Sequence, residues 1–339
     1  MKKIRVGING FGRIGRVAAR IIEGRDNLEL AAINSHADSS SHAYLLKYDS
    51  TYGIFNKKVK AIDNNFISID GRNITVFNRD TPSEIPWEKA NVDIVIDSTG
   101  LFTKKEDLMP HIRTSVKKVV LSSPAKDDMK TIVMGVNEEN FNVKTDHTVS
   151  NSSCTTNCLA TTLKVLDDSF NVKRGFMTTT HAVTDSQNLL DNSHKKETRL
   201  RRSAIASLIP ASTGSAKDIG KLFPKLNGKI LCRSIRVPLQ TVSLINVIVE
   251  LEEKTTIEEI HHVYNEYEKG GMKGILEVAQ EELVSKDYTG NPHSSIIDPF
   301  LTQILDGNLV NIYAWYDNEW GYTSRLVDLV ELIGKTLSS

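Results

Sequence analysis

Short apolar runs alternate with helically spaced apolar residues through the first half of the chain. Runs of strand character cover residues 3–9 and 27–33, and residues 13–23 between them have the spacing of a helix. Further buried-strand runs follow at 93–97, 118–121 and 131–136, separated by helix-like segments such as 104–115. This alternation predicts a Rossmann-type domain with a mostly parallel sheet, which we place at residues 1–152.

Beyond about residue 153 the pattern changes to long β-rich runs. They cover residues 173–183, 229–238, 241–251 and 309–316, and they predict a mainly antiparallel sheet with helices on one side. One of these helices is marked by a capping box, Thr256 with Glu259, and a last amphipathic helix is expected at 324–337. The predicted fold class is therefore α/β, with an α+β second domain at residues 153–318.

The composition excludes several kinds of partner. Lysine plus arginine and aspartate plus glutamate both total 42 in 339 residues, so no net charge favours nucleic acid or an anionic membrane. Three cysteines do not make a disulfide framework, which points to a reducing compartment. No apolar run approaches the roughly 18 residues of a spanning helix, and the first residues run into a strand rather than a signal sequence. We therefore expect a cytoplasmic protein.

Three glycines follow the first predicted strand and open the first predicted helix. The pattern is Gly10-x-Gly12-x-x-Gly15, and a second strand follows. In this context the glycines allow a tight turn, a close approach of the backbone to a pyrophosphate, and close packing of the helix on the strand. An ordinary βα turn is the alternative, but the strand-helix-strand frame favours a dinucleotide site.

The acidic residue that usually accompanies this motif is missing. It normally ends the second strand, about twenty positions beyond the last glycine, where it binds the adenosine ribose of NAD. Here that strand ends Ile33-Asn34-Ser35-His36. Ser35 removes the charge that would repel a 2′-phosphate, and it can donate a hydrogen bond to one.

A small, hydroxyl-rich stretch at residues 150–159 leads from a β-branched run into a predicted helix. Cys154 lies at this junction, where free backbone N–H groups and the positive end of a helix dipole favour a thiolate. Cys154 is therefore a candidate nucleophile, and the alternative is a small buried filler. Cys158 shares its helix face, but no second pair of cysteines or histidines has suitable spacing, so we predict no metal site.

Three long sequence words appear in the order that one enzyme family has. They are Asn9-Gly10-Phe11-Gly12-Arg13-Ile14-Gly15-Arg16, Ser150-Asn151-Ser152-Ser153-Cys154-Thr155-Thr156-Asn157-Cys158 and Trp315-Tyr316-Asp317-Asn318-Glu319-Trp320-Gly321-Tyr322. Over nearly its whole length the chain resembles phosphorylating glyceraldehyde-3-phosphate dehydrogenase. The resemblance implies reversible oxidation of glyceraldehyde 3-phosphate to 1,3-bisphosphoglycerate with a nicotinamide cofactor.

The resemblance also implies the chemistry. The Cys154 thiolate attacks the aldehyde to form a thiohemiacetal, hydride leaves to the nicotinamide, and phosphate attacks the resulting thioester. His181 ends a predicted strand and matches the family's catalytic histidine, whose imidazolium is expected to stabilise the thiolate near neutral pH.

Substrate phosphate and attacking phosphate both require fixed cations and hydroxyls. The residues that the resemblance implies for them are Ser153, Thr155, Thr184, Arg199, Thr213, Gly214 and Arg236. Arg236 matches the arginine that bridges both anion sites. The segment 195–202 carries one extra residue relative to the family pattern, so the register of Arg199 could slip to Arg201 or Arg202.

The cofactor contacts that the resemblance implies come from both halves of the chain. They are Asn9, Gly10, Phe11, Gly12, Arg13, Ile14, Asn34, Ser35, Arg79, Ser98, Thr99, Gly100, Ser122, Asn192, Ser193, Asn318 and Tyr322. Asn318 matches the residue that holds the nicotinamide carboxamide. The resemblance further implies that a helix at 319–339 packs back on the first domain and that the protein is a homotetramer.

Two departures from NAD-specific members of the family bear on the nucleotide. Ser35 replaces the ribose-binding aspartate, and Asn192-Ser193 stand where leucine and proline are usual, on a loop that reaches the adenosine ribose of a neighbouring subunit. Both changes relieve charge or bulk around a 2′-phosphate and add polar donors. We therefore expect NADP to be accepted beside NAD, and a preference for NADP is our hypothesis.

Two other functions fit parts of the pattern. Erythrose-4-phosphate dehydrogenase shares the cysteine and the histidine, but several of its members lack the Ser-Thr-Gly word and the threonine matching Thr184, both present here. A dinucleotide-binding regulator without catalysis would not need the intact set Cys154, His181, Thr213 and Arg236. Rapid labelling of Cys154 by iodoacetate near pH 7 would distinguish a reactive thiol from a buried structural one.

Overall fold

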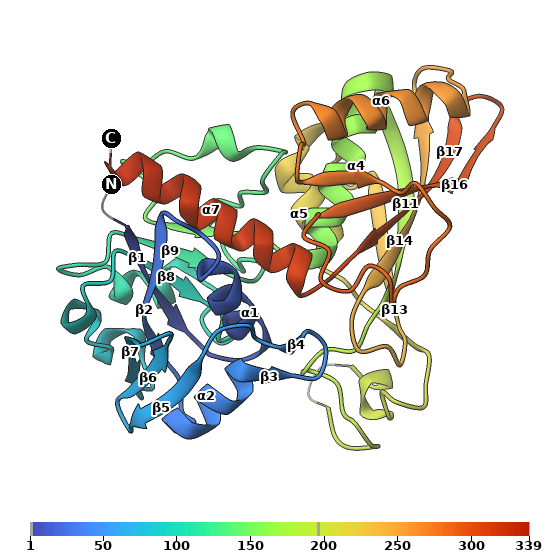
Figure 1. Cartoon of the computed structure of the whole chain (residues 1–339). Helices are drawn as coiled ribbons and strands as arrows, with labels where there is room; N and C mark the ends of the chain where they lie inside the picture. Colours follow the sequence, from blue (N-terminus) through green and yellow to red (C-terminus); the bar gives the residue numbers. More distant parts are fainter. Residues whose placement is uncertain (1–2, 195–196, 339) are drawn as a thin grey trace. The chain divides into compact units, whose positions relative to one another are not determined.

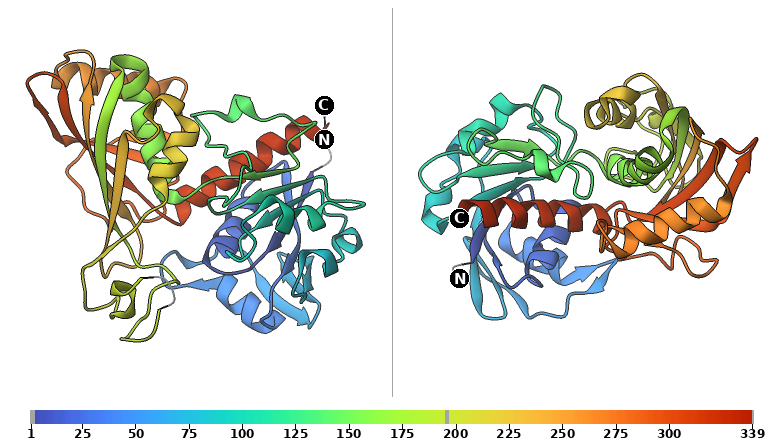
Figure 2. Two further views of the ribbon diagram at one scale, coloured as in Figure 1. Left: turned by 180° about the vertical axis from the view of Figure 1, so that it is seen from behind. Right: turned by 90° about the horizontal axis from the view of Figure 1, so that it is seen from above.

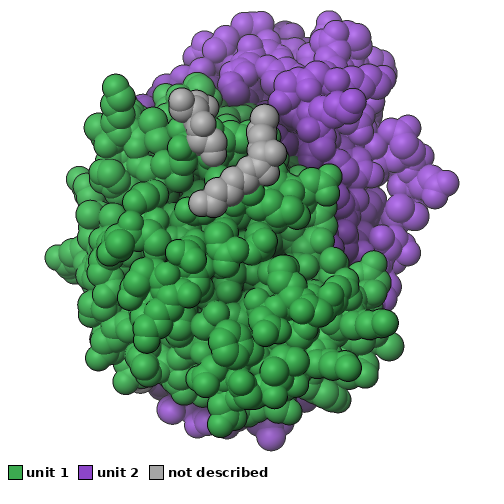
Figure 3. All heavy atoms as spheres, turned by 60° about the vertical axis from the view of Figure 1, so that its left-hand side comes forward, with its two compact units in different colours: residues 1–152, 323–339 green, residues 153–322 purple. Residues whose placement is uncertain are grey.

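The structure is a computed structural model that describes residues 3–194 and 197–338. The chain forms two compact units, coloured separately in Figure 3. Unit 1 comprises residues 1–152 and 323–339, and unit 2 comprises residues 153–322. Each unit has a large sheet of its own (Figure 1).

Unit 1 is built on an eight-stranded sheet in the order β10-β9-β8-β1-β2-β7-β6-β5. The strands are β1 (Ile4–Asn9), β2 (Leu28–Asn34), β5 (Val59–Asp63), β6 (Phe66–Ile69), β7 (Arg72–Phe77), β8 (Ile94–Asp97), β9 (Lys118–Leu121) and β10 (Thr148–Ser150). From β10 to β7 the neighbouring strands are parallel, and β6 and β5 extend the sheet as antiparallel strands. The predicted Rossmann-type sheet is confirmed.

The central strands of this sheet are apolar on both faces, which explains their continuous hydrophobic runs. In β8, Ile94 and Ile96 belong to one core, and Val95 belongs to the other. β9 divides in the same way, with Val120 in the first core and Val119 in the second. Successive side chains of a strand point to opposite faces, so a strand that is covered on both faces shows no polar alternation.

Helices and short elements complete unit 1. They are α1 (Arg13–Ile22), α2 (Ser39–Lys47), β3 (Tyr48–Asp49), β4 (Gly53–Ile54), α3 (Lys105–Leu108) and the 3-10 turns η1 (Pro82–Glu84), η2 (Trp87–Ala90), η3 (Met109–His111) and η4 (Glu138–Asn140). The last helix, α7 (Trp320–Ser338), starts in unit 2, and from Thr323 onward it belongs to unit 1. Its apolar stripe joins the first core through Leu326, Val327, Leu329, Val330 and Ile333.

One predicted strand of unit 1 is wrong. Residues 131–136 are not a strand, because Thr131 makes a single parallel bridge to Ser150 and the chain then turns at Gly135, where φ is 80°. Asn137 closes the turn: its side chain accepts from the Val133 N–H at 2.8 Å and donates to the Thr131 carbonyl at 2.9 Å. The apolar run marks burial, and the side-chain amide replaces the ladder hydrogen bonds of a strand.

The predicted helix at 104–115 is shorter than expected. α3 covers only Lys105–Leu108, and η3 follows it directly. Pro110 lies inside η3 and has no N–H to donate, so the α-helix does not continue through it. The turn directs His111 into the interior, where it is fully buried.

Unit 2 is built on a seven-stranded sheet in the order β12-β13-β11-β14-β17-β16-β15. The strands are β11 (Val172–His181), β12 (Ile209–Ala211), β13 (Ile230–Arg236), β14 (Ser243–Leu251), β15 (Leu276–Val278), β16 (Ser295–Leu305) and β17 (Leu309–Tyr316). Neighbouring strands are antiparallel except in the pairs β11–β13 and β15–β16. The predicted α+β domain with a mainly antiparallel sheet is confirmed.

Three helices lie on one face of this sheet (Figure 2). They are α4 (Cys154–Phe170), α5 (Ser215–Leu222) and α6 (Ile257–Lys269), and unit 2 also contains the 3-10 turns η5 (Arg199–Arg201) and η6 (Pro224–Leu226). α6 begins at the predicted capping box, in which the Glu259 N–H donates to Thr256 Oγ1 at 3.2 Å and the Thr256 N–H donates to the Glu259 carboxylate at 3.0 Å. Within the described ranges, no helix combines the length and the apolar character that a membrane span needs.

Candidate functional site

Cys154 is the first residue of α4, immediately after the chain enters unit 2. Ser153 caps this helix, because its hydroxyl accepts from the Thr156 N–H at 3.1 Å. The sulfur therefore lies beside the first turn of a helix, where the N–H groups and the dipole favour an anion. Cys154 is partly exposed, whereas Cys158 and Cys232 are buried.

His181 is the last residue of β11, and it faces the cysteine. Cys154 Sγ lies 3.5 Å from His181 Nε2. Arg236 ends the neighbouring strand β13, opposite His181 in the parallel register, and its Nη1 lies 2.7 Å from His181 Nδ1. The Ala182 carbonyl oxygen also lies 2.7 Å from Nδ1.

The histidine ring has a partner for either neutral tautomer. With its proton on Nδ1 it donates to the Ala182 carbonyl and presents a lone pair to the sulfur. With its proton on Nε2 it faces the sulfur with a donor and accepts from the Arg236 guanidinium at Nδ1. The ring can therefore hold a proton on the side of the sulfur or accept one there, and Nδ1 is hydrogen-bonded in both states.

Burial opposes charge on both members of this pair. Burial lowers the pKa of His181 to about 3, and the charge of Arg236 acts in the same direction. Burial raises the pKa of the Cys154 thiol, against smaller opposing effects of Arg236 and Thr155. Both shifts favour the neutral forms of the two groups. The imidazolium that the sequence leads us to expect stays a prediction, and the Arg236 guanidinium beside the ring opposes it.

Tyr316, to which the sequence assigned no role, supports the pair from the interior. Its hydroxyl contacts the hydroxyls of Thr155 at 2.9 Å and Thr179 at 2.8 Å, and its ring lies edge-on to the His181 ring with centroids 6.1 Å apart. Thr155 is buried, and its hydroxyl helps to lower the pKa of Cys154. The Thr155 side chain therefore acts on the cysteine, and its contact with a phosphate stays a prediction. Tyr316 continues the alternation of buried residues along β17, and this alternation is the signal from which its burial could have been predicted.

Two of the other predicted phosphate residues open a helix. Gly214 is the N-cap of α5, and Thr213 precedes it. Gly214 has no side chain to cap the helix, and the Ser215 N–H donates to the Thr213 hydroxyl at 3.4 Å. The N-terminus of α5 still carries the positive end of the helix dipole, which favours an anion. Thr184 lies on the loop that directly follows β11.

Arg199 lines a cavity of unit 2 in this structure. It is exposed and lines a cavity of about 670 Å³, together with Glu197, Ser212 and Arg233. Neither Cys154 nor His181 lines this cavity. Of the alternative registers, Arg202 is paired with Asp191 at 2.9 Å, and the neighbouring Lys195 and Lys196 lie outside the described residues.

The glycine loop of unit 1 has the geometry that a pyrophosphate requires. Gly10 has a φ of 89°, and a Cβ at this position would lie 2.7 Å from the Thr99 nitrogen. A Cβ at Gly15 would lie 2.2 Å from the Gly10 carbonyl oxygen, so only glycine lets α1 pack this closely on the loop. A Cβ at Gly12, the N-cap of α1, would meet no atom within 4 Å, which leaves open space beside the N-terminus of α1.

Comparison with known proteins identifies both parts of the chain. The glyceraldehyde 3-phosphate dehydrogenase NAD binding domain matches residues 4–105, and the C-terminal domain of the same family matches residues 153–318. Glyceraldehyde-3-phosphate dehydrogenase of Priestia megaterium is 44% identical over 330 residues, which are 97% of this chain and 98% of the relative. The chain belongs to the glyceraldehyde-3-phosphate dehydrogenase family.

Further relatives agree with this assignment. Glyceraldehyde-3-phosphate dehydrogenase 1 of Bacillus cereus is 45% identical over 325 residues, covering 96% of this chain and 97% of the relative. Glyceraldehyde-3-phosphate dehydrogenase of Streptomyces coelicolor is 44% identical over 336 residues, covering 98% and 99%. Because the family's NAD binding domain matches residues 4–105, which lie in unit 1, unit 1 is the NAD(P)-binding part of this chain.

At the end of β2 the structure brings together Asn34, Ser35 and Arg79. Asn34 Oδ1 accepts from the Arg79 N–H at 2.9 Å, and Ser35 follows Asn34 directly. The next acidic residue along the chain is Asp38, whose carboxylate accepts from the Ser41 N–H at 2.8 Å and caps α2. Asp38 therefore does not replace the acid that NAD-specific glyceraldehyde-3-phosphate dehydrogenases have at position 35.

The other predicted cofactor residues of unit 1 lie at the same edge of the sheet. Ser98, Thr99 and Gly100 follow β8, and Ser122 follows β9, because parallel strands end together. The Ser98 hydroxyl donates to the Gly10 carbonyl at 2.7 Å, which joins two of these loops.

Three more of these residues belong to the glycine loop and the start of α1. Phe11 is buried edge-on against the ring of His42, and Ile14 is half-buried. Arg13 forms an ion pair with Asp49, so its charge is engaged within unit 1.

The predicted cofactor residues of unit 2 are separated from one another in the chain. Asn318 is buried, and its Oδ1 accepts from the Ser243 hydroxyl at 3.1 Å. Tyr322 is also buried. Asn192 and Ser193 are exposed, and their contact with a neighbouring subunit's cofactor stays a prediction.

In the described ranges, no group of three or more histidine, cysteine or acidic side chains is arranged to hold a metal ion.

Proposed function

We propose that this protein oxidises glyceraldehyde 3-phosphate to 1,3-bisphosphoglycerate, reversibly, with NAD(P) and inorganic phosphate. The observation that carries the proposal is the 3.5 Å contact between Cys154 Sγ and His181 Nε2 at the N-terminus of α4. The names of the relatives in bacilli and in Streptomyces support the same activity. Membership of the family sets the substrate class, and the pair supplies the nucleophile and the base.

The reaction begins at the cysteine. The sulfur bonds to the aldehyde carbon while His181 Nε2 accepts the thiol proton, and His181 then passes this proton to the former carbonyl oxygen, which becomes the hydroxyl of a thiohemiacetal. When bound, the nicotinamide ring supplies the acceptor for the hydride that leaves this carbon. His181 takes up the hydroxyl proton as the thioester forms. Inorganic phosphate then attacks the thioester carbon, the C–S bond breaks, and the released sulfur of Cys154 takes back the proton from His181.

Arg236 and the N-terminus of α5 supply the positive field for the two phosphates. Arg236 Nη1 lies 2.7 Å from His181 Nδ1, so an anion bound to this guanidinium lies next to the reacting groups. We assign Thr213 and Gly214, with the N-terminus of α5, to the attacking phosphate, and Ser153 and Thr184 as further donors. Arg199 stays a candidate for one of the two phosphates.

Dependence on phosphate tests this function. With glyceraldehyde 3-phosphate as substrate, turnover is expected to require added phosphate or arsenate, because each can release the acyl group from the thioester. The measurement is the steady-state rate of nicotinamide reduction at increasing phosphate. A rate that is already maximal without phosphate would indicate water as the acceptor, as in erythrose-4-phosphate dehydrogenase.

We further propose that the protein accepts NADP and prefers it. At the end of β2, Ser35 carries no charge, and Asp38 is engaged as the cap of α2. Arg79 lies at the same place, because its backbone N–H donates to Asn34, and its side chain is exposed. We call Asn34, Ser35 and Arg79 together the Arg79 corner. A 2′-phosphate at this corner would meet a hydroxyl and a guanidinium. Comparison of kcat/KM for the two dinucleotides tests the proposal. A preference for NAD of 100-fold or more, about 2.7 kcal/mol, would overturn it.

A homotetramer is supported by an apolar row on the outer face of the unit 2 sheet. Leu231, Phe176 and Ile248 lie side by side on β13, β11 and β14, and they are 54%, 63% and 36% exposed. α4, α5 and α6 pack on the opposite face (Figure 2). An exposed apolar row of this kind is typical of a surface that is covered by another protein chain.

Replacing Phe176 by lysine tests the assembly. We expect Phe176→Lys to reduce the sedimentation coefficient to that of a smaller assembly, because a buried, unpaired charge destabilises an interface. Ile62→Lys is the matched control, since Ile62 is also an exposed apolar residue, 54% accessible, but lies on β5 of unit 1. A wild-type protein that sediments as a monomer would contradict the proposal, and so would a Phe176→Lys protein that assembles like the wild type.

A further inference from the structure

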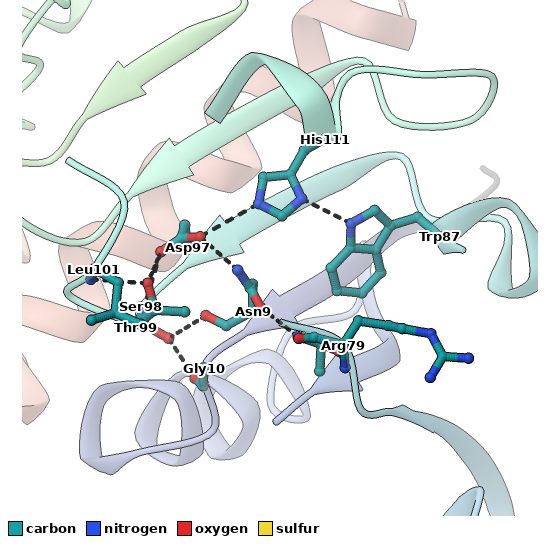
Figure 4. A network of polar contacts seen from close by, with 10 residues as sticks. Asn9, Gly10, Arg79, Trp87, Asp97, Ser98, Thr99, Leu101 and His111 are labelled. Atoms are coloured by element: carbon teal, nitrogen blue, oxygen red, sulfur yellow. Dashed lines mark hydrogen bonds and ion pairs between the residues drawn. The ribbon is translucent and has the colours of Figure 1, made fainter. Parts of the chain in front are cut away.

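A line of buried polar side chains crosses one edge of the unit 1 sheet (Figure 4). Asn9, Asn34 and Asp97 are the last residues of β1, β2 and β8, and the strand register places Asn9 beside both of the others. The residues before them in the strands are apolar and buried, among them Ile8, Ile33 and Ile96. The polar line is therefore confined to the carboxyl edge of the sheet, where a Rossmann-type domain binds its ligand.

The hydrogen bonds run without a break across three strands and into two loops. The Asn34 amide donates to Asn9 Oδ1 at 2.8 Å, and the Asn9 amide donates to Asp97 Oδ2 at 2.8 Å. Beyond the carboxylate, His111 Nε2 lies 3.4 Å from Asp97 Oδ2, and the Trp87 indole N–H donates to His111 Nδ1 at 3.0 Å. All five side chains are at most 4% exposed.

The direction of each bond is determined by the two ends of the line. An indole N–H only donates, so His111 Nδ1 accepts, and in the neutral ring the proton lies on Nε2 and faces Asp97. At the other end the Arg79 backbone both donates to and accepts from the Asn34 amide, at 2.9 Å and 3.0 Å. The Asp97 carboxylate thus accepts from His111 on one side and from Asn9 on the other. These bonds determine which end of the Asn9 and Asn34 side-chain amides is the oxygen and which is the nitrogen.

Asp97 also shapes the loop that follows β8. Its Oδ1 accepts from the Thr99 N–H at 3.2 Å and from the Thr99 hydroxyl at 2.8 Å. The adjacent Ser98 hydroxyl donates to the Gly10 carbonyl at 2.7 Å. The same carboxylate therefore holds the 98–100 loop, the glycine loop and, through Asn9 and Asn34, the Arg79 corner.

We propose that Trp87, His111 and Asp97 are positioning residues for the dinucleotide. They act through Asn9, Asn34 and the 98–100 loop, which the family resemblance assigns to the cofactor. A purely structural contact at this depth would be served at least as well by apolar side chains, which stabilise a core without the penalty of burying polar groups. The inference rests on the proposed function only in requiring that unit 1 binds a dinucleotide.

The test compares two substitutions of His111 in the full-length protein. His111→Leu removes both hydrogen bonds, and we expect the dissociation constants of NAD and NADP, measured by equilibrium dialysis, to rise about tenfold, which corresponds to 1.4 kcal/mol. His111→Gln keeps an N–H that can reach Asp97, so it is expected to restore most of the affinity. Val119→Ala is the control, because Val119 is fully buried in the same apolar core as Trp87 but its side chain can form no hydrogen bond in the polar line.

A positioning role and a merely structural role give different results. Positioning predicts that His111→Leu weakens binding while Val119→Ala, even with an equal loss of Tm, does not. It also predicts that Asp97→Asn raises the KM for the dinucleotide more than it lowers kcat, and that the alkylation rate of Cys154 in unit 2 is unchanged. Wild-type affinity in His111→Leu, or equal losses in His111→Leu and Val119→Ala, would overturn the assignment. Failure of the wild type to bind either dinucleotide would overturn the proposed function as well.

Discussion

Cys154→Ser is expected to lower kcat/KM for aldehyde oxidation by a factor on the order of 10⁴ or more. A serine hydroxyl is a much weaker nucleophile than a thiol at neutral pH. The base beside it is weak, since burial and the charge of Arg236 lower the pKa of His181 to about 3. The measurement is the initial rate of nicotinamide reduction with glyceraldehyde 3-phosphate and saturating phosphate.

Cys158→Ser is the matched control for this variant. Cys158 lies one helical turn further along α4, and its sulfur is fully buried, so it makes no contact with substrate in the proposed mechanism. Activity close to that of the wild type is expected. If Cys158→Ser were as inactive as Cys154→Ser, or if Cys154→Ser kept more than a hundredth of the activity, Cys154 would not be the nucleophile.

Alkylation provides an independent measurement on the same thiol. Burial raises the pKa of Cys154 above the ordinary thiol value of 9.0, so the thiolate fraction should rise about tenfold per pH unit below that pKa. The rate of reaction with iodoacetamide is therefore expected to increase with pH through the neutral range, without a plateau. Cys154 should still react first, because Cys158 and Cys232 are buried. A plateau below about pH 7 would instead indicate an imidazolium–thiolate pair with His181.

Ser35→Asp is expected to shift the ratio of kcat/KM for NADP to that for NAD by about 100-fold toward NAD. A carboxylate at this position accepts hydrogen bonds from the ribose hydroxyls of NAD and repels a 2′-phosphate. The backbone geometry should not change, because Ser35 lies on the surface of the corner, half-buried, after the last residue of β2. Steady-state kinetics with both dinucleotides at fixed aldehyde and phosphate give the ratio.

Two further variants define which groups produce this selectivity. Ser35→Ala removes the hydroxyl without adding charge, and it is expected to weaken NADP use by much less than Ser35→Asp does. Arg79→Gln removes the nearby guanidinium and should raise the KM for NADP more than that for NAD. If Ser35→Asp left the ratio unchanged, the 2′-phosphate would not lie at this corner, and the proposed preference would have to come from other residues.

The success and failure of the sequence predictions have physical reasons. Continuous apolar runs located β8 and β9 because both faces of the strands are covered by cores. The same signal was misleading at residues 131–136, where the side chain of Asn137 bonds the backbone and Gly135 turns the chain. In the segment 104–115, Pro110 stops the helix, and the resulting turn buries His111. Burial can be read from hydrophobicity, but the hydrogen-bond partners of a short buried segment cannot.

The sequence by itself determined the two kinds of sheet, the glycine loop, the cysteine at the start of a helix and the membership in the family. These features depend on local rules, namely the period of apolar residues, the conformations open to glycine, and motifs that are continuous in the chain. Only the tertiary structure decided that Arg236 lies against His181, that Thr155 and Tyr316 support the cysteine, and that Trp87, His111 and Asp97 form one line. These contacts join residues far apart in the chain, and their charge states follow from burial and neighbouring charges that exist only after folding.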